Sequence, residues 1–146
     1  LCLAMTLAVV IPVRAFLIER TIAPWLVATE AALAMPADVV IVDRIAIFYG
    51  LEIPRNGPYA AERPVVMMMD TLSADQIRRL CGNYRVAFFG ADEARQAGIP
   101  TRTLEEGLAS LTGMNTEILE RVADYREKYR FLTSGTCTAP PDATGN

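Results

Sequence analysis

The sequence predicts a small α/β domain with three layers, in which helices flank a short, mostly parallel sheet of about three to four strands. Three apolar runs suit strands that are covered on both faces, and they alternate with segments that carry helical signals; the runs are 38–43, 64–69 and 85–90. In addition, residues 1–18 contain a single charged side chain, Arg14. We therefore expect the end of a transmembrane helix ahead of the α/β domain.

The amino-terminal segment is apolar but short for a membrane span. Residues 1–13 carry no charge, and Arg14 separates them from a second apolar run, 15–18. A spanning helix needs about 20 apolar residues, so we expect the last part of a transmembrane helix that starts before Leu1. Two alternatives remain open. The segment could be a truncated signal peptide, or it could be a core helix of an ordinary soluble domain.

The first helices of the domain have recognisable start and stop signals. Thr21 is placed to cap a helix that Pro36 ends. Ser73 and Gln76 form a capping box that opens a helix over 74–81. The first of these helices precedes the strand-like run 38–43, and the second follows the run 64–69. Helices and strands that alternate in this way are typical of an α/β domain.

Two further helices are expected toward the carboxyl terminus. Thr103 and Glu106 make a second capping box. The last helix begins at Asn115 or Thr116 and has an apolar stripe at helical spacing, which consists of Ile118, Leu119, Val122, Tyr125 and Tyr129. The proline-rich end is expected to be disordered. The chain then divides into the end of a transmembrane helix (1–20), the α/β domain (21–132) and a tail (133–146).

The composition excludes several classes of function. The 146 residues include no histidine, which excludes histidine-based triads and most zinc sites. A net charge of -3 does not indicate the basic surface that nucleic-acid binding requires. Cys2, Cys81 and Cys137 lack metal-binding spacing, although a Cys81–Cys137 pair stays open for an oxidising compartment. We expect no metal site, no cofactor and no nucleic-acid partner.

A candidate ligand site lies where the first strand ends. Ligands gather at the carboxyl ends of strands in open α/β sheets, and Asp43 and Arg44 lie at the carboxyl end of the first strand-like run. The next segment, 45–63, is long and rich in turn residues, and long connections of this kind are often functional. We predict a ligand site that consists of Asp43, Arg44, Tyr49, Arg55, Asn56 and Tyr59.

These side chains suit an anionic or hydroxylated ligand. The planar guanidinium groups of Arg44 and Arg55 match a phosphate or a carboxylate. Asn56 and Tyr59 could form hydrogen bonds with the hydroxyls of a sugar. The alternative is that residues 55–58, Arg-Asn-Gly-Pro, are simply a turn. No catalytic residue is predicted.

The order of the segments resembles a family of membrane proteins. The expected apolar helix ends in a segment that contains Arg14 and Arg20. Three segments follow it: ALAMPADVVIVD, PRNGPYAAERPVVMM and LSADQIRRLCGNYRVAFFG. In this order, over about residues 1–100, the chain resembles the carboxyl-terminal extramembrane region of bacterial polytopic proteins of the GT-C glycosyltransferase superfamily. That superfamily includes mannosyltransferase-like and aminoarabinose-transferase-like members.

The resemblance implies a non-catalytic accessory domain of a transferase that uses a polyprenyl-phosphate sugar. The catalytic acid of such enzymes lies in their first extracytoplasmic loop, which nothing here matches. The implied location is the bacterial inner membrane, with the domain on the periplasmic side. The implied partners are the lipid bilayer, upstream transmembrane helices and a lipid-linked sugar or acceptor.

Other interpretations of the same segments remain. Arg14 and Arg20 beside the apolar helix favour the cytoplasmic side by the positive-inside rule. The alternatives for function are a stand-alone soluble α/β binding module and a membrane-tethered structural domain.

Overall fold

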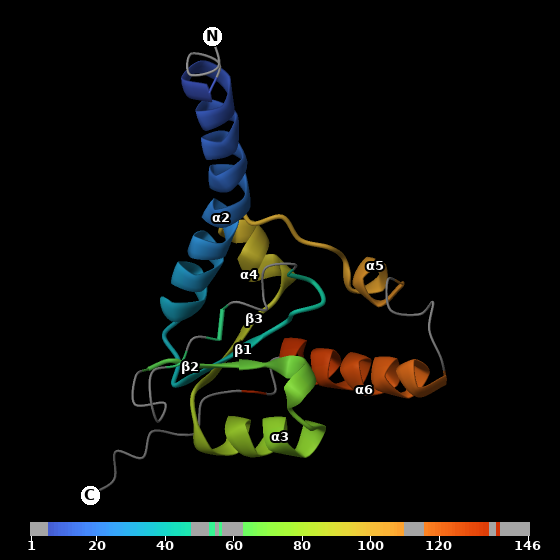
Figure 1. The fold of residues 1–146 in the computed structure, drawn as a ribbon. Helices are drawn as coiled ribbons and strands as arrows, with labels where there is room; N and C mark the ends of the chain where they lie inside the picture. The colour runs from blue at the N-terminus through green and yellow to red at the C-terminus, as the bar shows by residue number, and fades with distance from the viewer. Residues whose placement is uncertain are drawn as a thin grey trace, which may run out of the picture.

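The computed structural model describes residues 6–47, 53–54, 56, 63–109, 116–134 and 137. A long helix extends beyond a short sheet, and the end of this helix together with shorter helices covers the two faces of the sheet (Figure 1). In chain order the elements are η1 (Thr6–Val10, a π-helical turn), α2 (Ile11–Leu33), β1 (Val39–Val42), β2 (Val65–Met68), η4 (Met69–Thr71, a 3-10 turn), α3 (Ala74–Asn83), β3 (Val86–Phe89), α4 (Ala91–Gln96), α5 (Leu104–Ala109) and α6 (Thr116–Thr133).

The sheet is parallel throughout, with the strand order β2-β1-β3. In the register of the pairing, Val40 of β1 lies between Val66 of β2 and Ala87 of β3. The three predicted strands are therefore present, each shorter than its apolar run by about one residue at both ends. The predicted α/β class, with a short parallel sheet and flanking helices, is confirmed.

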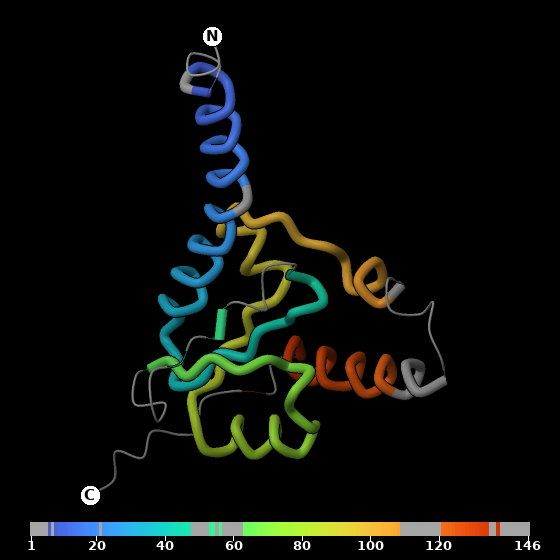
Figure 2. Tube along the Cα trace, in the orientation of Figure 1, coloured from blue at the N-terminus to red at the C-terminus, as the bar shows by residue number. Residues whose placement is uncertain are grey.

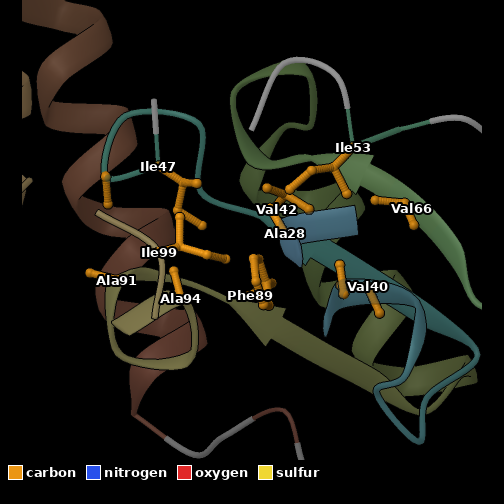
Figure 3. Packing of buried hydrophobic residues seen from close by; sticks show 12 residues of the cluster. Ala28, Val40, Val42, Ile47, Ile53, Val66, Phe89, Ala91, Ala94 and Ile99 are labelled. Carbon is orange, nitrogen blue, oxygen red and sulfur yellow. The ribbon is translucent and has the colours of Figure 1, made fainter. Parts of the chain in front are cut away.

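Alternate residues of β1 face two separate layers, as the two-residue period of a strand requires. Val40 and Val42 pack with α2 and α4 through Ala28, Ala32 and Ala94 (Figure 3). The opposite layer consists of α3, α5 and α6. Its buried side chains, which include Ile77, Leu108 and Val122, pack with Val39 and Ile41 on the other face of β1. The continuous apolar run is thus explained by burial on both faces.

The helix α2 is continuous from Ile11 to Leu33, and the expectation that Thr21 caps a new helix is wrong. Residues on both sides of Thr21 are mostly good helix formers, so the helix extends through this position. Pro24 lies inside the helix, where it removes one backbone donor. The boundary drawn between residues 20 and 21 therefore falls within one helix.

The other predicted helix starts are confirmed. The Ser73 hydroxyl accepts from the Gln76 backbone N–H (3.2 Å), and the Gln76 side chain accepts from the Ser73 N–H (2.7 Å). Thr103 and Glu106 form the same reciprocal pair ahead of α5. The last helix, α6, begins at Thr116. Each box satisfies backbone donors that a helix start leaves unpaired.

A disulfide joins Cys81 of α3 to Cys137, which follows α6. The two Cα atoms are 5.1 Å apart, within the range that a disulfide requires. The pair that the sequence left open is therefore present. It fastens the segment after α6 to the helical layer on one face of the sheet.

The amino-terminal half of α2 projects beyond the sheet and its covering helices (Figure 2). Only its carboxyl-terminal part reaches the core, through Ala28 and Ala32. None of the helices in the described part of the chain is both long enough and apolar enough to cross a membrane.

Candidate functional site

The carboxyl ends of β1 and β2 bring two aspartates close together. Asp43 directly follows β1, and Asp70 lies in η4, directly after β2. Val42 and Met68 are paired at the ends of these neighbouring strands, and paired strands lie about 4.8 Å apart. This edge of an open parallel sheet is where ligands usually bind.

Asp43 is fully buried, and its Oδ1 atom is well satisfied. This oxygen accepts hydrogen bonds from the backbone N–H groups of Ile45 (2.9 Å) and Ala46 (3.1 Å), and from the Tyr125 hydroxyl. Burial raises the pKa of the Asp43 carboxyl, and the nearby charge of Asp70 acts in the same direction, while the three hydrogen bonds oppose the rise. The turn after β1 and the helix α6 thus hold the carboxylate in place.

Tyr125 is a neutral donor in this arrangement. Its side chain is buried in α6 and donates to Asp43, which lies 82 positions earlier in the sequence. Burial and the charge of Asp43 raise the pKa of the Tyr125 hydroxyl far above its ordinary range. Tyr125 therefore keeps its proton and links α6 to the end of β1.

A cavity of about 550 Å³ lies beside this cluster. Arg44 and Asp70 line it and form an ion pair of 2.8 Å between Nη2 and Oδ2. Lys128, which is only 4% exposed, lines the cavity too and pairs with Asp124. The cavity therefore has charged walls of both signs, at the end of the sheet where the sequence predicted a ligand.

The structure places the predicted site residues in different positions. Asp43 and Arg44 lie at the end of β1, beside the cavity. The Asn56 side chain instead pairs with Val66 of β2, whose backbone N–H donates to its oxygen (2.7 Å) and whose carbonyl accepts from its amide (2.8 Å). Asn56 thus makes the hydrogen bonds at the outer edge of β2 that the backbone of a neighbouring strand would otherwise make. The predictions for Tyr49, Arg55 and Tyr59 fall outside the described residues.

Sequence reasoning missed two members of the cluster. Asp70 directly follows the second strand-like run, and Asp43 ends the first, so the acidic residue at each strand end is a signal for this pair. The sequence indicates Tyr125 only as part of an apolar helical stripe, because nothing local reveals its partner at the end of a distant strand.

Comparison with known proteins adds no assignment. No family model, curated protein or solved structure matches the chain. Within the described residues, no three histidine, cysteine, aspartate or glutamate side chains gather as metal ligands.

Replacing Tyr125 with phenylalanine should lower the free energy of unfolding by about 1–3 kcal/mol, because a buried carboxylate loses one of its donors. Urea denaturation followed by circular dichroism measures this. The matched control is Tyr84→Phe, which removes a hydroxyl from an exposed tyrosine and should change stability by less than about 0.5 kcal/mol. Equal effects of the two substitutions would contradict a structural role for the Tyr125–Asp43 bond.

Proposed function

We propose that the chain is an extramembrane α/β domain that its amino-terminal helix anchors in a membrane. The observation that carries the proposal is the exposure of large apolar side chains around this helix. These side chains are 40–60% exposed: Val9, Val10, Ile11, Val13, Phe16, Leu17, Ile18, Ile22, Leu26 and Val27. Such a helix needs an apolar environment that the domain itself does not supply.

The exposed side chains surround the helix and do not form a single stripe. Successive residues of an α-helix are turned by about 100°, so Phe16, Leu17 and Ile18 point in three different directions. All three are more than half exposed. Arg14 is the only charged residue among residues 6–18. A helix with apolar residues on all sides is typical of a buried or membrane environment, whereas a partner that binds one face would leave the others in water.

The length of the apolar stretch limits what it can do alone. Residues 6–18 span about 20 Å at 1.5 Å per residue, and the hydrocarbon core of a bilayer is about 30 Å thick. We infer that this stretch enters the apolar core as part of a membrane-embedded segment. Arg20, at its end, has a long side chain that suits the polar interface.

The narrower proposal is that the domain is the non-catalytic accessory part of a membrane glycosyltransferase that uses a polyprenyl-phosphate sugar. The resemblance of residues 1–100 to the GT-C superfamily supports it. The proposed location is then the bacterial inner membrane, and the proposed partners are the bilayer, further transmembrane helices and a lipid-linked sugar or acceptor. The charged cavity at the end of the sheet offers groups to such a ligand.

The disulfide favours the periplasmic side for the domain. Disulfides persist in oxidising compartments and are rare in the cytosol, and Cys81 pairs with Cys137 in the folded domain. Arg14 and Arg20 favour the opposite side by the positive-inside rule. Two arginines beside one acidic neighbour, Glu19, are the weaker of the two signals, because loops elsewhere in a membrane protein contribute to its orientation.

Flotation with lipid vesicles tests the anchor. The purified chain is reconstituted from detergent into vesicles of phosphatidylethanolamine and phosphatidylglycerol, and the vesicles are washed at alkaline pH and floated on a density gradient. The wild-type chain should float with the lipid. The variant Phe16→Glu/Ile18→Glu should stay at the bottom, because two charges in the apolar core cost several kcal/mol.

The matched control carries the same change of charge on the domain. Tyr84→Glu/Gln96→Glu alters two exposed positions outside the anchor and should float like the wild type. Circular dichroism checks that all three chains are folded. A wild-type chain that is monomeric without detergent and does not float would overturn the proposal. A detergent-free dimer that does not float would assign the helix to contacts between copies.

A further inference from the structure

We propose that Asp43 and Asp70 bind a divalent metal ion, with Mg²⁺ as the best match, at the carboxyl ends of β1 and β2. This inference goes beyond the membrane anchor and does not depend on it. It rests on two buried carboxylate oxygens, Asp43 Oδ2 and Asp70 Oδ1, that have no hydrogen-bond partner among the described residues.

An unpartnered carboxylate oxygen is costly inside a protein. Buried polar atoms are nearly always paired, and each exception needs an explanation. All three donors that reach Asp43 go to Oδ1, and Arg44 reaches only Oδ2 of Asp70. In each residue one oxygen is therefore held by the protein, while the other is buried without a donor. A cation would satisfy both.

The two orphaned oxygens belong to neighbouring strand ends. Asp43 is one residue past the paired Val42, and Asp70 is two residues past its partner Met68. Asp43 has no exposed surface, so the protein has removed its charge from water. The ordinary position of a buried charge is beside an opposite charge or a metal.

The chemistry of this pair matches a hard cation. Mg²⁺ prefers oxygen ligands and is commonly held by one or two carboxylates, while water or ligand oxygens complete its octahedral shell. The absence of a third acidic ligand from the described residues is therefore compatible with Mg²⁺, whereas Ca²⁺ usually takes six to eight oxygens.

The cavity gives the ion access and room for its remaining ligands. Asp70 lines the cavity directly. Ile45 and Tyr125, which both hold Asp43 by hydrogen bonds, line it as well. Asp70 and the two groups that hold Asp43 thus border a space of about 550 Å³, which has room for coordinated water.

Calorimetry tests the proposal with the metal alone. The full chain, in detergent and freed of metal by a chelator, is titrated with MgCl₂ and with MnCl₂. We expect one site per chain, and we expect Asp70→Asn to weaken it at least tenfold because a neutral amide replaces one carboxylate. Asp43→Asn should have the same effect if it folds; Asp70, which lies nearer the solvent, provides the second variant.

The matched controls are Asp75→Asn and Asp92→Asn, which neutralise exposed aspartates in other helices. They should bind Mg²⁺ like the wild type. Mg²⁺ should also raise the melting temperature of the wild type and of both controls, but not that of Asp70→Asn.

Absence of binding up to about 10 mM, beyond the range of weak protein sites, would overturn the proposal, as would binding that persists in Asp70→Asn. Vesicle flotation is measured separately, so failure of one proposal is distinct from failure of the other.

Discussion

Replacing Phe89 with alanine should destabilise the domain by about 3–5 kcal/mol. Phe89 ends β3 and is almost completely buried between the sheet and the helices α2 and α4 (Figure 3). The substitution removes a large apolar side chain and leaves a cavity that its neighbours cannot fill. Chemical denaturation followed by circular dichroism gives the change in the free energy of unfolding.

The neighbouring phenylalanine is the matched control. Phe88 points to the opposite layer, is only partly buried, and meets the Tyr129 ring edge to face at 5.7 Å between centroids. Phe88→Ala should therefore cost less than Phe89→Ala, because less buried surface is lost. A larger cost for Phe88→Ala would contradict the assignment of the two faces of β3.

Removing the disulfide with Cys81→Ala/Cys137→Ala should cost about 4 kcal/mol, the loop-closure entropy for a crosslink of this span. The two cysteines are 56 positions apart, so the bond strongly restricts the unfolded chain. Denaturation of the oxidised wild type, the reduced wild type and the double variant measures the effect.

A reducing agent provides the internal control for the disulfide. Reduction should lower the stability of the wild type toward that of the double variant and leave the double variant unchanged. Mass spectrometry of peptides from the oxidised chain should show Cys81 linked to Cys137. Equal stability of oxidised and reduced wild type would contradict a structural role for the bond.

The features that sequence alone predicts here are those with a local cause. Apolar runs of four to six residues are typical of strands buried on both faces, and β1, β2 and β3 all lie within such runs. Ser73 with Gln76 bonds within one helical turn, so its capping box is visible in four letters of sequence. Thr21 has a similar local signal, but the extended helix on both sides outweighs it.

The candidate site could be predicted only in part, because its contacts join distant segments. Asp43 and Arg44 were placed at the sheet edge by the rule for parallel strands. The bond from Tyr125 crosses 82 positions of sequence, and its origin on α6 depends on how that helix packs. The role of Asn56 at the edge of β2 likewise depends on the fold, since the same asparagine also suits a turn.

The continuity of α2 has a mechanical consequence. A helix of 23 residues is about 35 Å long, and its last turns are packed into the core through Ala28 and Ala32. The exposed apolar half and the packed half therefore belong to one continuous helix, with Pro24 between them. A tilt of the free half therefore reaches the sheet through the last turns of the helix, less any bending at Pro24, where one backbone hydrogen bond is missing.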